Sequence, residues 1–433
     1  MKTTKGIIFL RFTLASFIVL LLLAAVGYNS AQANSQVKIV GPAGSGYFGA
    51  SVVALSNGNI VVTDPYYDDG AKQDVGAVYL YNGATRELIS TLKGSTAFDK
   101  VGYIVSALPS GNFLVRSILW NNNGKSGAGA VTWVNGTTGL NGVVSASNSL
   151  VGSSTNDYIG NSLTILSNGN YVLYSMNWDN GGLTNVGHAT WGDGNTGVSG
   201  VVSAANSLVG TASDNGVGEN VVALTNGNYV VSSTYWDNGG NTNAGAVTWG
   251  DGMTGITGPV TTANSMYGST SNDRIGNFGI VPLTNGNYVV QSPYWFNTIL
   301  MRSNAGAVTW GNGATGTTGA VSTSNSLVGD QVNSNIGSEV TALSNGNYVV
   351  GSWLRDNGVI PDAGAITWGN GSTGTTGIVS AANSMVGTQA NDYIGSTIAA
   401  LTNGNYVAMS TAWDDGVIPD AGAITWGNGS TGT

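Results

Sequence analysis

The chain lacks cysteine and has almost none of the side chains that most enzymes use. Its 433 residues include no cysteine and a single histidine, His188. The absence of cysteine excludes disulfides, thiolate metal sites and lipid attachment through cysteine. A lone histidine also excludes His-rich zinc sites and Cys-His catalytic pairs. His188 stands where a recurring Gly-Ala-Val motif has its alanine, which indicates a repeat-position substitution rather than a general base.

Charge is scarce, and cations are the scarcer sign. Only 8% of the residues are charged, and 13 Lys and Arg against 22 Asp and Glu give a net charge of -9. Phosphate recognition needs clustered Lys and Arg, so DNA, RNA and anionic lipid are unfavourable partners. The three glutamates, Glu87, Glu219 and Glu339, form no evident pair. A carboxylate-pair hydrolase needs only two acids, so that alternative stays open.

Long apolar runs are also missing, except at the N-terminus. An apolar stretch runs from Phe12 to Val26, with Lys2, Lys5 and Arg11 before it and Ala31-Gln32-Ala33 after it. This pattern predicts a signal peptide over residues 1–33, followed by a secreted or cell-surface chain over 34–433. The alternative is an uncleaved anchor, but the stretch is shorter than the roughly 20 residues that span a bilayer. We therefore expect no membrane insertion of the mature chain.

A block of roughly 58 residues occurs seven times, which is the signature of a repeat architecture. Each block has a tight turn, most often Asn-Gly-Asn, and later a strand-like Gly-Ala-Val-Thr-Trp segment. The turns lie at 57–59, 110–112, 168–170, 226–228, 285–287, 345–347 and 403–405. The second segment begins at Gly76, Gly129, Gly187, Gly245, Gly306, Gly364 and Gly422.

The fourth copy, which starts at Gly218, predicts four short strands. Asn-Gly tolerates the positive φ of a hairpin turn, so 221–224 and 229–232 are expected to form a hairpin. A third strand is expected over 245–249 and a fourth near 260–267. Since no helical periodicity follows the N-terminus, each repeat is predicted to form one blade of an all-β propeller.

The two ends of the chain suggest how such a propeller closes. The seventh copy stops after its third strand, whereas residues 36–41 match the fourth-strand register of residues 87–94. We therefore predict a seven-bladed β-propeller of four-stranded antiparallel blades, with the last blade closed by the N-terminal strand, because closure removes exposed edges. The alternative is a fragment of a longer array.

Two families resemble this pattern. The first copy has Phe48-Gly49-Ala50-Ser51, then Asp64-Pro65 and then GAVYLYNG from Gly76, and it resembles the FG-GAP repeat of integrin-α-type propellers. The later copies are similar to a secreted bacterial repeat of hemagglutinin-like or adhesin-like proteins, a repeat of unknown function. The FG-GAP resemblance implies calcium in the first hairpin loop. Here that loop reads LTNGN or LSNGN, so the carboxylate ligands are gone and no cofactor is expected.

Recurring aspartates form the first candidate site. They fall in loops predicted to share one face of the propeller, where a carboxylate ring could bind cations or repel polyanions. The alternative is that each caps its own loop by accepting backbone N–H bonds. The series after the second strand contains Asp68, Asp179, Asp237, Asp356 and Asp414, and the series between repeats contains Asp99, Asp157, Asp214, Asp273 and Asp392.

Tryptophan occurs in two series. The first is predicted to pack between blades as core, and it contains Trp133, Trp191, Trp249, Trp310, Trp368 and Trp426. The second ends the second strand beside the Asp loops, and it contains Trp120, Trp178, Trp236, Trp295, Trp353 and Trp413, with Tyr67 in the first copy. Aromatic faces beside Asn and Asp suit sugars, although packing between blades is the alternative.

These patterns favour a non-enzymatic, adhesin-like module that binds a glycan or an extracellular protein through one face. The predicted ligand-binding residues are Trp178, Trp236, Trp295, Trp353, Trp413, Asp179, Asp237, Asp356 and Asp414. No catalytic or metal-binding residue is predicted. A spacer module without a ligand and a carboxylate-pair hydrolase are the alternatives.

Overall fold

The computed structural model describes residues 36–432. The predicted signal peptide therefore lies outside the described residues. All 32 described elements are strands. None of the described residues forms a helix long and apolar enough to cross a membrane.

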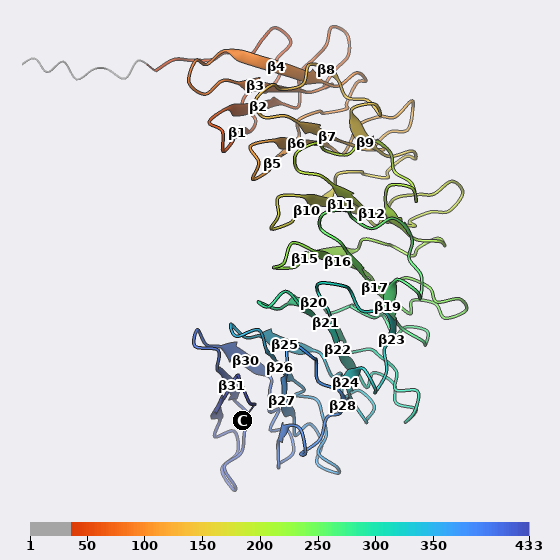
Figure 1. Ribbon diagram of the computed structural model, residues 1–433, viewed down its shortest axis with the longest axis vertical. Coiled ribbons are helices and arrows are strands. Elements are labelled where there is room, and N and C mark those ends of the chain that lie inside the picture. The colour runs from red at the N-terminus through yellow and green to blue at the C-terminus, as the bar shows by residue number, and fades with distance from the viewer. Residues whose placement is uncertain (1–35, 433) are drawn as a thin grey trace, which may run out of the picture. The chain divides into compact units, whose positions relative to one another are not determined.

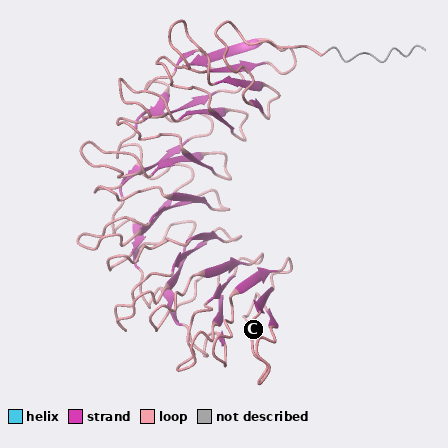
Figure 2. Ribbon diagram, turned by 180° about the vertical axis from the view of Figure 1, so that it is seen from behind, coloured by secondary structure: helices cyan, strands magenta, loops and turns pink. Residues whose placement is uncertain are grey.

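Seven sheets follow one another in chain order, one for each repeat (Figures 1 and 2). The all-β prediction and the seven repeats are thus confirmed. The first strand of each repeat is β1 (Val52–Ala54), β5 (Ile104–Ala107), β10 (Ser162–Ile165), β15 (Asn220–Ala223), β20 (Gly279–Pro282), β25 (Glu339–Ala342) and β30 (Thr397–Ala400). The second strand is β2 (Ile60–Asp64), β6 (Phe113–Ser117), β11 (Tyr171–Ser175), β16 (Tyr229–Ser233), β21 (Tyr288–Ser292), β26 (Tyr348–Gly351) and β31 (Tyr406–Ser410).

The third strand carries the Gly-Ala-Val-Thr-Trp motif and pairs antiparallel with the second. The third strands are β3 (Ala77–Tyr81), β7 (Ala130–Val134), β12 (His188–Gly192), β17 (Ala246–Gly250), β22 (Ala307–Gly311), β27 (Ala365–Gly369) and β32 (Ala423–Gly427). The fourth strands are β4 (Leu88–Lys93), β9 (Ser149–Val151), β14 (Leu208–Val209), β19 (Ser265–Tyr267), β24 (Ser326–Val328) and β29 (Met385–Val386).

A fifth strand joins each of the first five sheets to the next repeat, and the sequence did not predict it. In the fourth copy the predicted strand near 260–267 is in fact shorter, and the residues just before it, β18, pair in parallel with β14 of the preceding sheet. The linking strands are β8 (Gly142–Val143), β13 (Gly200–Val201), β18 (Gly258–Pro259), β23 (Gly319–Ala320) and β28 (Gly377–Ile378). Neighbouring sheets are therefore joined by backbone hydrogen bonds as well as by packing.

The closed ring that we predicted is not formed in this structure. The last sheet contains only β30, β31 and β32, all from the seventh repeat. Residues 36–42 form no strand. The structure therefore does not confirm the expectation that the N-terminal segment completes the last sheet, and the last described sheet has three strands.

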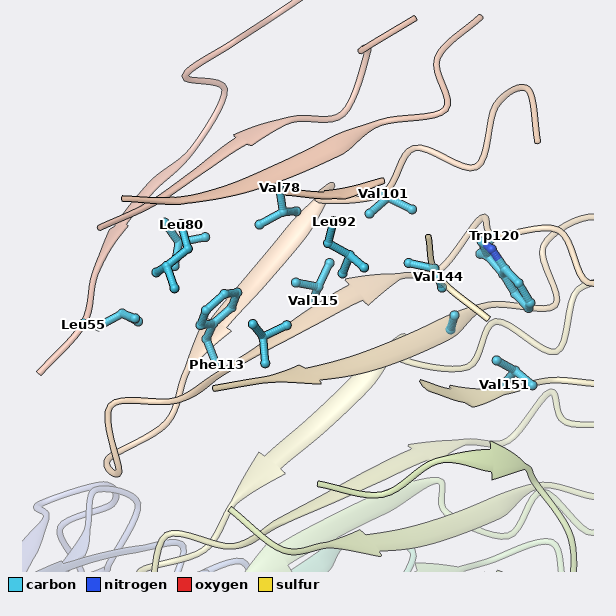
Figure 3. Close-up of a cluster of buried hydrophobic side chains, with 13 residues drawn as sticks. Leu55, Val78, Leu80, Leu92, Val101, Phe113, Val115, Trp120, Val144 and Val151 are labelled. Carbon is cyan, nitrogen blue, oxygen red and sulfur yellow. The ribbon is translucent and has the colours of Figure 1, made fainter. Parts of the chain in front are cut away.

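The hydrophobic core lies between sheets, because alternate residues of each strand point to opposite sheet faces. Between the first two sheets, Leu80 and Leu92 of repeat 1 pack with Phe113 and Val115 of repeat 2 (Figure 3). Similar clusters fill the later junctions. Adjoining repeats thus bury their facing apolar surfaces against each other, as stacked repeats do. On the other face of repeat 1, Tyr79 and Tyr81 pack against Phe48 of the same repeat.

The Asn-Gly turns also tie neighbouring repeats together. In the third repeat, Gly169 takes a positive φ of 89° at the turn. The side-chain amides of Asn168 and Asn170 both donate to the carbonyl of Gly252 in the fourth repeat, at 2.8 Å each. Asn170 Oδ1 in turn accepts from the N–H of Gly194 in its own repeat, at 2.9 Å. This Asn–Gly ladder requires amides at these turn positions, because the bond to a carbonyl needs a donor.

Candidate functional site

The aspartates that follow the second strand hold their own loops. Oδ1 of Asp179 accepts the backbone N–H of Asn185 at 2.8 Å, and Oδ1 of Asp237 accepts that of Asn243 at 2.8 Å. In the same way, the carboxylates of Asp68, Asp356 and Asp414 each accept the backbone N–H of the residue six positions later, which is Asp74, Asp362 and Asp420 respectively. These predicted site residues therefore act as loop caps in every copy where they occur.

The aspartates between repeats are buried and accept backbone N–H bonds, except Asp214, which is exposed and accepts the side-chain amide of Asn185 at 3.0 Å. Asp157 Oδ2 accepts from Ser153 and Ser154 at 2.8 Å each, and its Oδ1 accepts from Asp179 at 3.0 Å. The two aspartate series thus meet in the third repeat, where the carboxylate of Asp157 accepts the backbone N–H of Asp179. Both carboxylate oxygens of Asp157 accept N–H bonds. No group of three or more His, Cys, Asp or Glu side chains in residues 36–432 could hold a metal ion.

Asp273, in this buried series, makes the pH dependence of stability predictable. Burial raises the pKa of Asp273 to about 6, although N–H bonds from Phe296, Thr270 and Ser269 favour its ionised form. Between the unfolded pKa of about 4 and this value the folded state binds more protons, so stability falls as pH rises. We expect the free energy of unfolding to be about 1 kcal/mol higher at pH 5 than at pH 7 from this group.

The measurement is urea unfolding of the protein and of Asp273→Asn at both pH values. The variant should lose this part of the pH dependence. Asparagine already occupies the corresponding position at Asn215, where Oδ1 accepts the N–H groups of Thr211 and Ala212. An unchanged difference between pH 5 and pH 7 in Asp273→Asn would contradict the assignment.

His188 is fully buried in β12 and is not placed for catalysis. Its Nδ1 lies 2.9 Å from the hydroxyl of Thr190, and burial lowers the pKa of His188 to about 3. The ring packs edge-on against Trp178. It is therefore neutral and enclosed at physiological pH, which agrees with its interpretation as a substituted alanine.

The tryptophans predicted to bind a ligand lie mostly inside the protein. Trp178, Trp236 and Trp295 are buried in the clusters between sheets. Trp413 is only partly buried. Because a ligand cannot reach the three buried rings, we move the candidate site away from this series.

Trp353 needs a correction of register. In the other repeats the residue of this series accepts the N–H of the glycine that precedes the third strand, as Trp236 does from Gly245. In the sixth repeat Gly364 donates instead to Arg355. Arg355 therefore occupies the tryptophan position, and its Nε donates to the carbonyl of Val379 at 3.1 Å. Trp353 lies two residues earlier and packs edge-on against Tyr393.

The internal members of the other tryptophan series, predicted to pack between blades as core, do pack against the clusters between sheets, at their edge. Each of these members is half-buried. Each indole N–H donates to a glycine carbonyl of the following repeat, as Trp133 does to Gly194 at 3.1 Å and Trp368 to Gly429 at 2.9 Å. This bond fixes one edge of the ring and leaves part of the indole accessible.

Two grooves occur at equivalent positions along the repeats. The groove between repeats 2 and 3 has a volume of about 500 Å³, and the one between repeats 6 and 7 has about 530 Å³. Trp133 and Asn148 line the first, and their counterparts Trp368 and Asn383 line the second. Small polar residues, glycine and apolar residues complete the walls, with Leu140 in the first groove and Met385 and Tyr406 in the second, and no charged side chain lines either groove. An aromatic face with neutral hydrogen-bonding groups around it can stack on an apolar ligand face and bind hydroxyls.

Sequence reasoning missed these grooves because it assigned the first tryptophan series to the core from its side of the strand. Parity predicts which sheet face a side chain lies on, but not whether the next sheet covers it. Gly197, which has a φ of 77°, is the residue that could have indicated this groove from the sequence. A Cβ there would lie 2.4 Å from Cβ of Trp133, so the glycine makes room for the indole at the groove.

Comparison with known families agrees with the repeat boundaries. A family described as "Repeat of unknown function (DUF5650)" matches residues 54–103, 107–161, 165–219, 223–277, 282–338, 342–396 and 400–433. No curated protein matches the chain. Since these seven matches cover most of the sequence, the chain belongs to the DUF5650 family of repeats of unknown function.

Proposed function

We propose that this protein is an exported, non-enzymatic, adhesin-like module that binds a neutral glycan in the grooves beside the half-buried tryptophans. The observation that supports the proposal is the recurrence of one groove at equivalent positions in repeats 2/3 and 6/7. A row of equivalent sites suits a polysaccharide, because that ligand repeats the same unit along its length.

The chemistry of the grooves favours a neutral sugar over a charged ligand. Neither groove is lined by Lys, Arg, Asp or Glu. The indole faces supply stacking area, and the side chains of asparagine, serine and threonine supply donors and acceptors for hydroxyl groups. The N-terminal apolar stretch supports export to a compartment where glycans are encountered.

A non-enzymatic role is supported by the occupied state of the acidic side chains. The buried aspartate carboxylates between repeats accept backbone N–H bonds, and the single histidine is enclosed. A glycosidase would need two carboxyl groups facing one open site. The spacer alternative is supported by a different observation, the Asn–Gly ladder, which gives the repeats a stabilising role without any ligand.

The test is affinity electrophoresis of the purified protein in gels that contain neutral polysaccharides, namely galactomannan, hydroxyethyl cellulose and dextran. The expected result is retardation by at least one of them. Glutamates at the groove rims, in the double variant Ser147→Glu and Ala382→Glu, should weaken retardation about tenfold, because a carboxylate would need to be desolvated by the ligand.

The matched control is Val359→Glu with Val417→Glu, which adds the same charge at two exposed loop positions outside both grooves. The rim positions are exposed, so neither variant removes a packing contact. Equal retardation of the two double variants would reject the grooves as the site. No retardation of the unsubstituted protein by any of the three polysaccharides would reject the glycan and favour the spacer.

A further inference from the structure

Asparagine followed by glycine can lose its side-chain amide without an enzyme, and this chain has many such pairs. The backbone nitrogen of the glycine attacks Cγ of the asparagine, which it can reach because glycine has no Cβ and a permissive backbone. The attack requires the amide group to rotate over that nitrogen. A hydrogen bond that fixes the amide group, or that engages the glycine N–H, therefore protects the pair.

The Asn-Gly pairs in the hairpin turns and after the third strands are protected in this way. In the turn of repeat 3, the amide of Asn168 donates to the carbonyl of Gly252 at 2.8 Å. After the third strand of repeat 5, Oδ1 of Asn312 accepts the N–H groups of Ala314 and Thr315, at 2.8 and 3.1 Å. These pairs are therefore expected to react slowly.

Two loops after the second strands carry the same five residues, Trp-Asp-Asn-Gly-Gly, at 178–182 and 236–240. Their backbones also agree. In each loop the asparagine exchanges two backbone hydrogen bonds with the residue three positions later. The following glycine has a positive φ in both, 63° at Gly181 and 60° at Gly239. The two pairs thus share sequence and backbone geometry, and only the surroundings of the asparagine side chains distinguish them.

The asparagine side chains of these two loops differ in their contacts. The amide of Asn238 donates to the carbonyl of Gly268 at 3.0 Å, and the corresponding asparagines of repeats 2, 5 and 6 make the same bond. The side chain of Asn180 is exposed and makes no hydrogen bond within the described residues. Among the Asn-Gly pairs of residues 36–432, this is the pair in which the amide group and the glycine N–H are both free.

We propose that Asn180 is a site of spontaneous deamidation, with water as the reactant. The nitrogen of Gly181 gives its proton to solvent and bonds to Cγ of Asn180. The Cγ–Nδ2 bond breaks, and Nδ2 takes up a proton and leaves as ammonia. Water then opens the resulting succinimide ring at either carbonyl, which leaves an aspartate or an isoaspartate at this position. One water is consumed and one ammonia is released, and nothing is oxidised or reduced.

The product changes the loop and not the grooves. Each event adds one negative charge beside Asp179, whose carboxylate holds the loop through the N–H of Asn185. An isoaspartate also lengthens the backbone between position 180 and Gly181, which displaces the two backbone bonds that Asn180 exchanges with Leu183. Asn180 lines neither groove, so this modification does not depend on glycan binding.

Peptide mapping by mass spectrometry tests the proposal. The folded protein is incubated at mildly alkaline pH, then unfolded and digested with chymotrypsin, which cuts after Trp178 and Trp236. The peptide that starts at Asp179 should gain the mass that marks loss of an amide about fivefold faster than the peptide that starts at Asp237. This is the factor that one hydrogen bond of ordinary net strength contributes. The second peptide is the matched control, since its reacting pair has the same neighbours.

Two further samples show whether the reaction occurs at Asn180 and whether the folded structure sets its rate. Asn180→Gln should abolish the mass gain of the first peptide, because attack on glutamine closes a larger ring, and this separates Asn180 from Asn185 in the same peptide. Protein kept unfolded in guanidinium chloride should react at equal rates in the two loops. Equal rates in the folded protein would overturn the proposal. So would a difference that persists on unfolding, or a mass gain that survives in Asn180→Gln.

Discussion

Replacing Asn170 by aspartate is expected to destabilise the protein by about 3–5 kcal/mol at neutral pH, since it leaves a buried charge without a partner. The Asn170 side chain is buried, and its amide donates to the Gly252 carbonyl at 2.8 Å. Aspartate has the same shape but would place a carboxylate oxygen against that carbonyl. The bond that Oδ1 accepts from the N–H of Gly194 would remain. The loss of stability therefore measures the contribution of the Asn170 amide donor, which links the two repeats.

The measurement is urea unfolding of Asn170→Asp and of Asn405→Asp. Asn405 accepts the equivalent bond from Gly429 at 3.1 Å, but its amide has no acceptor within the described residues. Asn405→Asp should therefore cost less than about 1 kcal/mol. The cost of Asn170→Asp should shrink at low pH, where a protonated carboxyl regains a donor. Equal losses in the two variants would show that the amide donor contributes nothing to stacking.

Replacing Gly250 by valine should have the second large effect, a loss of about 3 kcal/mol through overpacking. Gly250 pairs across the sheet with Tyr229, and a Cβ on Gly250 would lie 2.2 Å from Cζ of that fully buried ring. The glycine has no positive φ. The cost is therefore steric and does not include backbone strain.

Repeat 2 shows how the same space can be shared differently. There Phe113 pairs with Val134, in place of a tyrosine paired with a glycine. The double variant Tyr229→Phe with Gly250→Val should recover part of the loss. It should remain about 1 kcal/mol short, because the Tyr229 hydroxyl accepts the N–H of Ile256 at 3.2 Å. Thermal unfolding of both variants is the check, and equal melting temperatures for the two would contradict the pairing argument.

The strands of each repeat could be predicted because their signals are local. The Asn-Gly turn between 221–224 and 229–232 predicted a hairpin, and the structure has β15 and β16 there. The two-residue strand β18 could not be predicted, since Gly258 and Pro259 have little β propensity and pair only because the preceding sheet offers β14. Ring closure, which the structure does not confirm, was predicted from the shared register of two segments. Register shows which strands can pair, but not which strands do pair.

The candidate site was also hard to predict from the sequence, because the surroundings of its side chains depend on neighbouring repeats. The recurring aspartates were predicted with two open roles, and the structure gives Asp157 and Asp179 the loop-capping one. The tryptophans were assigned to core or ligand by position within a strand. Their exposure depends instead on the neighbouring repeats: Trp178 is buried in the cluster between repeats 2 and 3, whereas Trp133 lies beside a groove at the same junction. Arg355 could have been placed by aligning on Gly364 rather than on the nearest tryptophan.

The fixed offset of the Asn–Gly ladder has a consequence for how the gene can change length. Each amide reaches only the adjoining repeat, as Asn285 does to Gly371 at 2.9 Å. Residues 364–375 and 422–433 are identical, so recombination between the two stretches would delete one repeat of about 58 residues. Asn285 would then meet the carbonyl now supplied by Gly429, with the same neighbours around it. Copies can therefore be lost or gained as whole units during evolution, and each new junction is already matched.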